Sequence, residues 1–141
     1  MFDPASVVVV KCPRRKALFL AADRLGCNKM AFGHHSDDVA QTTLLNLFYH
    51  GRLETTEPRV TFFGGKITVI RPLLYVPEKE LFRFARACEF PVGGAPCPQG
   101  ANSARTKMQN LLRTLEKDCP QVKANLFRAT QQHRRERGLR D

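Results

Sequence analysis

Several features that mark other protein classes are missing from this sequence of 141 residues. Its five cysteines form no CxxC pair, and their odd number argues against a disulfide framework. The apolar run Val7–Val10 is too short to span a bilayer, and no basic segment of a secretory signal precedes it. Internal repeats and low-complexity stretches are also absent. We therefore expect a cytoplasmic protein with reduced thiols and no membrane association.

Acidic residues are scarce relative to basic ones. Lys and Arg number 23 and Asp and Glu 13, so the formal net charge is +10 at neutral pH. From Arg105 to Asp141 the basic residues outnumber the acidic ones ten to four. A domain this basic favours a polyanionic partner, and nucleic acid is the leading candidate. For the basic end itself, a solvated and frayed terminus is an equally simple explanation.

Apolar periodicity and turn residues predict alternating helices and strands. The predicted elements are, in chain order, a helix at 13–26, a strand at 28–33, a helix that ends near 50, a hairpin at 58–71, a helix from 77, a loop at 90–103 and two further helices. This order indicates part of an α/β sandwich followed by a small helical C-terminal region. The predicted divisions are an atypical N-terminal segment at 1–12, a partial α/β domain at 13–92, and a cysteine-containing loop with basic helices at 93–141.

Details of these elements are also predicted. Gly64-Gly65 is expected to form a two-residue hairpin turn, and Ser36 or Asp37 to cap the helix that Gly51 ends. Pro77 is expected at the first position of its helix. The side chains expected to be buried are Leu44, Leu45, Leu47 and Phe48 in one helix, Leu81, Phe84, Ala85 and Cys88 in the next, and the further cysteines Cys27 and Cys119.

The strongest concentration of polar chemistry is GHHSDD, residues 33–38, between the predicted strand and the helix after it. Ligands of open α/β sheets bind where strands end. Carboxylates can hold Mg²⁺ beside phosphates, histidines can donate hydrogen bonds, and helix-start amides attract anions. Adjacent aspartates at a helix start are, however, often only caps. The motif alone leaves both interpretations open.

The motif and several other segments resemble those of a known protein family. GHHSDDVAQTTLLNLFYHG resembles the GHHxDDxxQT motif of the PP-loop ATP pyrophosphatase superfamily, and most closely its TtcA-like branch, which makes 2-thiocytidine in tRNA. RRKALFLAADRLG, FFGGKITVIRPLLYVPEKEL and CPQGANSARTKMQNLL resemble further segments of that branch in the same order. The resemblance covers roughly residues 14–130.

The resemblance implies a Rossmann-like adenine-nucleotide sandwich of PP-loop (HUP) type, present here in part. It implies an enzyme that adenylates a tRNA base with ATP and Mg²⁺ and replaces its oxygen with sulfur from a persulfide carrier or sulfide. By this match, Asp37 and Asp38 act in the adenylation step, and His34, His35 and Arg71 belong to the ATP site. Cys97 matches one of three cysteine ligands of a [4Fe–4S] cluster. A homodimer is also implied.

Two family features have no counterpart in this sequence. The SGGxDS phosphate loop is absent, and the positions of the family's CxxC fall near Val7 and Val10. A single matched cysteine cannot hold an iron–sulfur cluster. We therefore expect a truncated or frameshifted product, or the C-terminal part of a longer enzyme, that is inactive alone. The alternatives are another PP-loop tRNA modifier, forming lysidine or 2-thiouridine, and a non-catalytic basic RNA-binding fragment.

Overall fold

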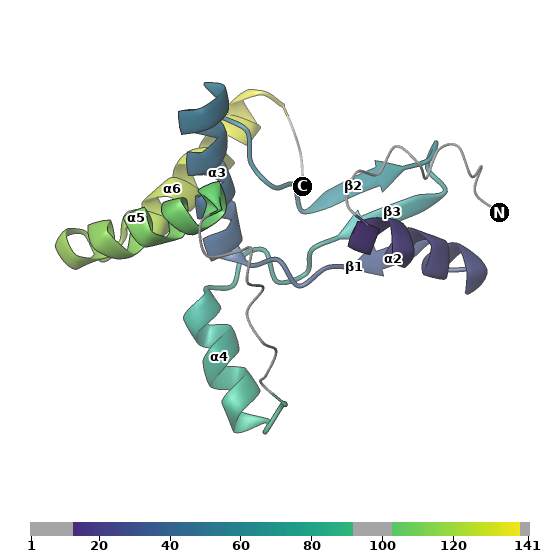
Figure 1. Ribbon diagram of the computed structural model, residues 1–141. Coiled ribbons are helices and arrows are strands. Elements are labelled where there is room, and N and C mark those ends of the chain that lie inside the picture. The colour runs from purple at the N-terminus through teal and green to yellow at the C-terminus, as the bar shows by residue number, and fades with distance from the viewer. Residues whose placement is uncertain (1–12, 92–102, 139–141) are drawn as a thin grey trace. The chain divides into compact units, whose positions relative to one another are not determined.

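The computed structural model describes residues 13–91 and 103–138 (Figure 1). Its elements, in chain order, are α2 (Pro13–Arg24), β1 (Lys29–Ala31), α3 (Ser36–His50), β2 (Arg59–Phe62), β3 (Ile67–Ile70), α4 (Glu78–Ala87), α5 (Ala104–Asp118) and α6 (Val122–Glu136). They form two compact units. Unit 1 comprises Met1–Gly33 and Glu57–Pro72, and unit 2 comprises His34–Thr56 and Leu73–Asp141.

Unit 1 is a three-stranded sheet with one helix packed on it. The strand order is β1-β3-β2, with β1 parallel and β2 antiparallel to β3. Ile67 and Val69 alternate along β3 and therefore point to the same face, where they pack against Phe19 and Ala22 of α2. Phe19 is 1% exposed, and its ring lies 5.3 Å from that of Phe62. An aromatic cluster thus fastens the helix to the sheet.

The hairpin between β2 and β3 corrects the sequence prediction. Phe62 pairs with Ile67, so four residues, Phe63 to Lys66, form the connection in place of the expected Gly-Gly turn. Three of them in succession, Phe63, Gly64 and Gly65, have positive φ angles of 55°, 65° and 90°. Glycine adopts this conformation without strain, whereas phenylalanine rarely does. The ring of Phe63 packs edge-on against Phe19, which explains why the core accepts that backbone conformation.

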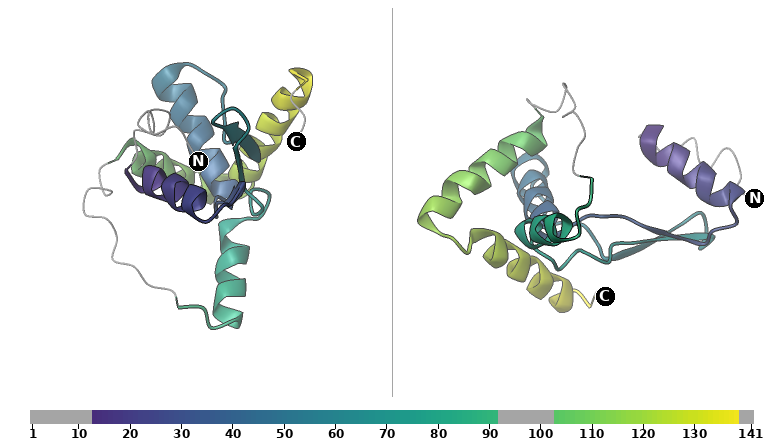
Figure 2. Two further views of the ribbon diagram at one scale, coloured as in Figure 1. Left: turned by 90° about the vertical axis from the view of Figure 1, so that its right-hand side faces the viewer. Right: turned by 90° about the horizontal axis from the view of Figure 1, so that it is seen from below.

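Unit 2 is a cluster of three helices with α4 attached to it. Helix α3 packs against α5 and α6, which also contact each other, and both views of Figure 2 keep the three together. The buried residues between α3 and α5 are Ala40, Leu44, Met108 and Leu112. Gly51 ends α3 in the left-handed conformation, as predicted, and its N–H bonds back to the last turn. Ser103 caps α5 by accepting the Thr106 N–H.

Several predicted burials in unit 2 are wrong. Leu47 and Phe48 of α3 are 43% and 59% exposed, because the contacts with α5 and α6 use a different face of the helix. Helix α4 has no buried residue: Phe84 is 61% exposed and Cys88 is also exposed. Cys119 of unit 2 and Cys27 of unit 1, both expected in cores, are exposed as well. Pro77 precedes α4 as its cap and is not its first residue.

Among the residues that the structure describes, no helix combines the length and the apolar character needed to cross a bilayer.

Candidate functional site

The GHHSDD motif forms the entry into α3. His35 is extended (φ −127°, ψ 178°) and is the cap residue, so neither Ser36 nor Asp37 has the capping position predicted for it. The His35 N–H donates to the Asp38 carboxylate at 3.0 Å, and the Ser36 N–H donates to the Val76 carbonyl at 3.1 Å. The start of α3 is thereby fixed to the segment that leads into α4. Asp37 and Asp38 occupy the first turn, where the helix dipole favours negative charge.

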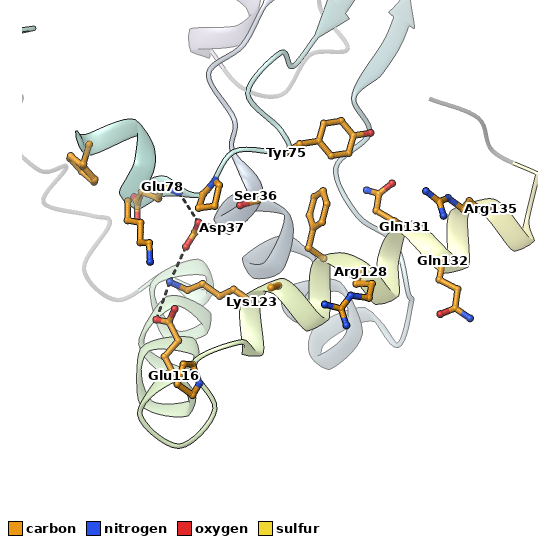
Figure 3. A pocket seen from close by; sticks show the side chains of 16 residues that line it. Ser36, Asp37, Tyr75, Glu78, Glu116, Lys123, Arg128, Gln131, Gln132 and Arg135 are labelled. Atoms are coloured by element: carbon orange, nitrogen blue, oxygen red, sulfur yellow. Dashed lines mark hydrogen bonds and ion pairs between the residues drawn. The ribbon is translucent and has the colours of Figure 1, made fainter. Parts of the chain in front are cut away.

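Asp37 links α3 directly to α4 and α6, and through Lys123 to α5. Its side chain is almost fully buried, and Oδ1 accepts the backbone N–H of Glu78 at the start of α4, at 2.9 Å. Oδ2 lies 2.8 Å from the ammonium of Lys123 on α6, which also contacts Glu116 of α5 at 3.0 Å. Figure 3 shows this chain of charges, carboxylate to ammonium to carboxylate. The Asp37 carboxylate therefore both caps α4 and pairs with α6.

These contacts perturb ionisation in opposite senses. Burial raises the pKa of Asp37, but the Glu78 N–H and the Lys123 ammonium outweigh it, so the pKa lies below its ordinary value of 3.8. Burial lowers the pKa of Lys123, but Asp37 and Glu116 together raise it above 10.5. Both groups are therefore ionised at neutral pH. The ion pair therefore stabilises the fold until acid protonates Asp37 or alkali deprotonates Lys123.

The Asp37 carboxyl should make unit 2 sensitive to acid. Because its pKa is lower in the folded than in the unfolded chain, its contribution is complete above about pH 5 and is lost as the pH falls below 4. Asp37→Asn removes this contribution. Urea unfolding at about pH 6 and pH 3 should therefore show a stability deficit of the variant that shrinks at the lower pH. An equal deficit at both pH values would contradict the assignment.

Asp38 makes a second set of contacts. Its Oδ1 lies 2.9 Å from Arg105 at the start of α5, and the Arg105 Nε donates to the side chain of Gln41 at 3.3 Å. Its Oδ2 accepts the His35 N–H and lies 3.5 Å from the His35 imidazole, whose Nε2 is 3.8 Å from Glu78. All four carboxylate oxygens of the two aspartates thus have protein partners. Part of the acceptor capacity of both carboxylates is therefore used within the protein.

The other predicted site residues do not take part in the contacts of Asp37 and Asp38 described above, or they lie outside the described residues. His34 is half-buried in the turn before α3. Arg71 follows β3 in unit 1, where it is buried and donates to the Glu57 carbonyl. Burial and the neighbouring Arg15 lower the pKa of its guanidinium. Cys97 lies outside the described residues. Across residues 13–91 and 103–138, no group of three or more His, Cys, Asp or Glu side chains is arranged to hold a metal ion.

A groove of about 1050 Å³ opens beside Asp37, between the start of α4 and one face of α6. We call it the α4–α6 groove. Its lining residues are Ser36, Asp37, Tyr75, Pro77, Glu78, Lys79, Phe82, Glu116, Pro120, Lys123, Ala124, Phe127, Arg128, Gln131, Gln132 and Arg135 (Figure 3). Sequence patterns did not indicate this groove, because its walls come from segments far apart in the chain. The basic C-terminal composition was the one available signal.

The chain is similar in sequence to curated proteins of known name. No protein-family profile matches it. It is 46% identical over 130 residues to a tRNA-cytidine(32) 2-sulfurtransferase of Geobacter sulfurreducens, covering 89% of this chain and 51% of that protein. It is 48% identical over 118 residues to the protein of the same name from Citrifermentans bemidjiense, covering 82% and 46%. The chain therefore spans about half the length of the curated relatives it matches.

A solved structure has a similar fold. The U34-tRNA thiolase NcsA from Methanococcus maripaludis, solved with its [4Fe-4S] cluster, matches with a TM-score of 0.65 and 27% sequence identity. The match covers 94% of this chain and 44% of the thiolase chain. The partial α/β fold predicted from the sequence is confirmed by this likeness.

Proposed function

Because the chain is homologous over most of its length to PP-loop tRNA-cytidine(32) 2-sulfurtransferases, we propose that it is part of an enzyme forming 2-thiocytidine in tRNA. The observation that carries this proposal is the 46% identity over 130 of its residues. We further propose that the chain is an incomplete form. It would act only together with a segment that supplies the SGGxDS loop and the CxxC pair.

The proposed nucleotide site is the turn between β1 and α3. Its proposed residues are His34, His35, Asp37, Asp38 and Arg71. The position of the turn supports this, since it follows a parallel strand and opens a helix, where phosphates are favoured. The contacts of Asp37 and Asp38 support a positioning role, in which the two carboxylates hold the start of α3 against α4, α5 and α6.

ATP and Mg²⁺ are the proposed cofactors of the complete enzyme. Across the described residues no group of three or more His, Cys, Asp or Glu side chains is arranged to hold a metal ion, so no reaction step is assigned to the ion here. Cys97 is proposed as one ligand of a [4Fe–4S] cluster. When bound, such a cluster supplies iron to which the transferred sulfur can attach. The described residues hold no set of cluster ligands, so no step is derived through it.

The proposed partners follow from the same assignment. They are tRNA, a sulfur donor that is a persulfide carrier or sulfide, and a second copy of the chain. A tRNA substrate is consistent with the net charge of +10, and a cytoplasmic location is proposed with it. A 2-thiouridine-forming activity is the second candidate, because the similar solved structure is a U34-tRNA thiolase. The higher identity to the cytidine enzymes favours 2-thiocytidine.

The proposal is tested by supplying the N-terminal half. The N-terminal half of the Geobacter sulfurreducens relative, joined to residues 13–141, is expressed in a bacterial strain that lacks its own 2-thiocytidine enzyme. Mass spectrometry of tRNA nucleosides should detect 2-thiocytidine with this chimera and none with the 141-residue chain alone. Formation of 2-thiocytidine by the chain alone would refute incompleteness, and 2-thiouridine as the product would refute the cytidine assignment.

Two serine substitutions test Cys97 within that chimera. Cys97→Ser should abolish the product, because loss of a ligand prevents the cluster from forming. Cys88→Ser is the matched control, since this exposed thiol at the C-terminal end of α4 has no proposed role. Equal loss of product in both variants would mean a general effect on the protein and would remove the support for Cys97.

A further inference from the structure

The α4–α6 groove has an excess of positive charge. Its four Lys and Arg side chains outnumber its three acids by one: Asp37 and Glu116 share Lys123, and Glu78 lies 3.8 Å from the imidazole of His35. Its other cations, Lys79, Arg128 and Arg135, are exposed, and none forms an ion pair with another described residue. Positive charge left unpaired along a concave surface attracts a polyanion.

The two arginines lie in a row along α6. The lining residues Ala124, Phe127, Arg128, Gln131, Gln132 and Arg135 recur at intervals of three and four, so they share one face of the helix. At 1.5 Å per residue, Arg128 and Arg135 are separated by about 10 Å along the axis. The two glutamine amides between them can donate and accept hydrogen bonds. Figure 3 shows this polar row beside Tyr75.

Aromatic side chains also line the groove, next to its basic residues. Tyr75 is 49% exposed, and its ring meets that of Phe127 edge-on, with centroids 5.5 Å apart and planes at 86°. Phe82 of α4 also lines the groove and is 48% exposed. Cations interleaved with exposed rings are typical of surfaces for single-stranded nucleic acid, whose unpaired bases stack on aromatic faces. A single strand offers both phosphates for the cations and flat bases for the rings.

We propose that the α4–α6 groove binds a single-stranded segment of tRNA, with Arg128 and Arg135 on phosphates and Tyr75 stacked on a base. The inference rests on the proposed function, which makes tRNA the partner. It adds the place on this chain where the tRNA is held. Because the groove borders Asp37 at the start of α3, a strand bound there lies next to the proposed nucleotide site.

Binding of a tRNA transcript to the full chain, measured by fluorescence anisotropy over a range of salt concentrations, tests the cations. The double variant Arg128→Ala/Arg135→Ala should bind at least about tenfold more weakly. The slope of log affinity against log salt should become shallower by about 0.7 for each phosphate that an arginine no longer neutralises. The matched control is Lys107→Ala/Arg113→Ala, which removes the same charge from exposed positions of α5. Its affinity should change by less than about threefold.

A second pair of variants tests the stacking. Tyr75→Ala should weaken binding by at least about fivefold without changing the salt slope, whereas Tyr75→Phe keeps the ring and should bind as the parent chain does. Thermal unfolding of each variant checks that the fold is retained. Inorganic polyphosphate added as competitor should displace the transcript poorly, since it offers charge without bases.

The possible outcomes separate the groove from the proposed function. If the parent chain binds tRNA but the groove and α5 variants are weakened equally, the groove assignment fails while the tRNA partner stands. Equal tRNA affinities of Tyr75→Ala and Tyr75→Phe, or efficient displacement of tRNA by polyphosphate, would also refute the groove assignment. Either result would mean that the surface binds polyanions in general. The proposed function has an independent measurement, because thiolation by the chimera does not depend on the anisotropy result.

Discussion

Asp37→Ala is expected to lower the free energy of unfolding by about 3 kcal/mol, because three groups lose a charged partner or a cap at once. The Glu78 N–H loses its acceptor, Lys123 keeps only Glu116, and the first turn of α3 loses a favourable charge. Urea unfolding measures the decrease. Hydrogen exchange of the Glu78 amide should accelerate even where the rest of unit 2 stays protected, because that amide is left without a partner.

Asp37→Asn is the control for this effect. Its side-chain oxygen can still accept the Glu78 N–H, so the expected decrease is about 1 kcal/mol, attributable to the missing ion pair. The Glu78 amide should remain protected. Equal destabilisation by alanine and asparagine would mean that the charge alone matters and that Asp37 does not cap α4.

Phe19→Ala should destabilise unit 1 by about 3–5 kcal/mol, the range found for removal of a buried aromatic ring. The ring is 1% exposed and contacts Phe62 and Phe63, so its removal leaves a cavity between α2 and the sheet. Hydrogen exchange of the backbone amides of β2 and β3 at increasing urea concentrations measures the change. Leu25→Ala, just beyond α2 and 77% exposed, is the matched control and should change stability by less than about 0.5 kcal/mol. Similar destabilisation by both variants would contradict the role given to the Phe19 ring.

Local signals in the sequence predicted the helices and the motif turn well. Pro13 begins α2 and Gly51 ends α3, because each acts through its own backbone or through residues within one turn. The motif turn was likewise located correctly between β1 and α3. Such positions can be predicted because the physics that fixes them is contained in a few consecutive residues.

Contacts between distant segments could not be predicted in the same way. Nothing near Asp37 in the sequence indicates that Lys123 will neutralise it, and nothing near Phe63 indicates that Phe19 will hold it at positive φ. The exposed face of α4 was mistaken for a core face because amphipathic spacing says which side is apolar but not what covers it. The roles of His34, His35, Asp37, Asp38, Arg71 and Cys97 in the nucleotide and cluster sites stay predictions.

The Asp37–Lys123 pair also bears on the order in which the chain can fold. Helix α3 is synthesised before its partners α5 and α6, which leave the ribosome later. Until Lys123 emerges, the first turn of α3 has an uncompensated carboxylate, and the apolar side of the helix lacks these two neighbours. Unit 2 can therefore be completed only after α6 has been made, while unit 1 can assemble once β3 is complete.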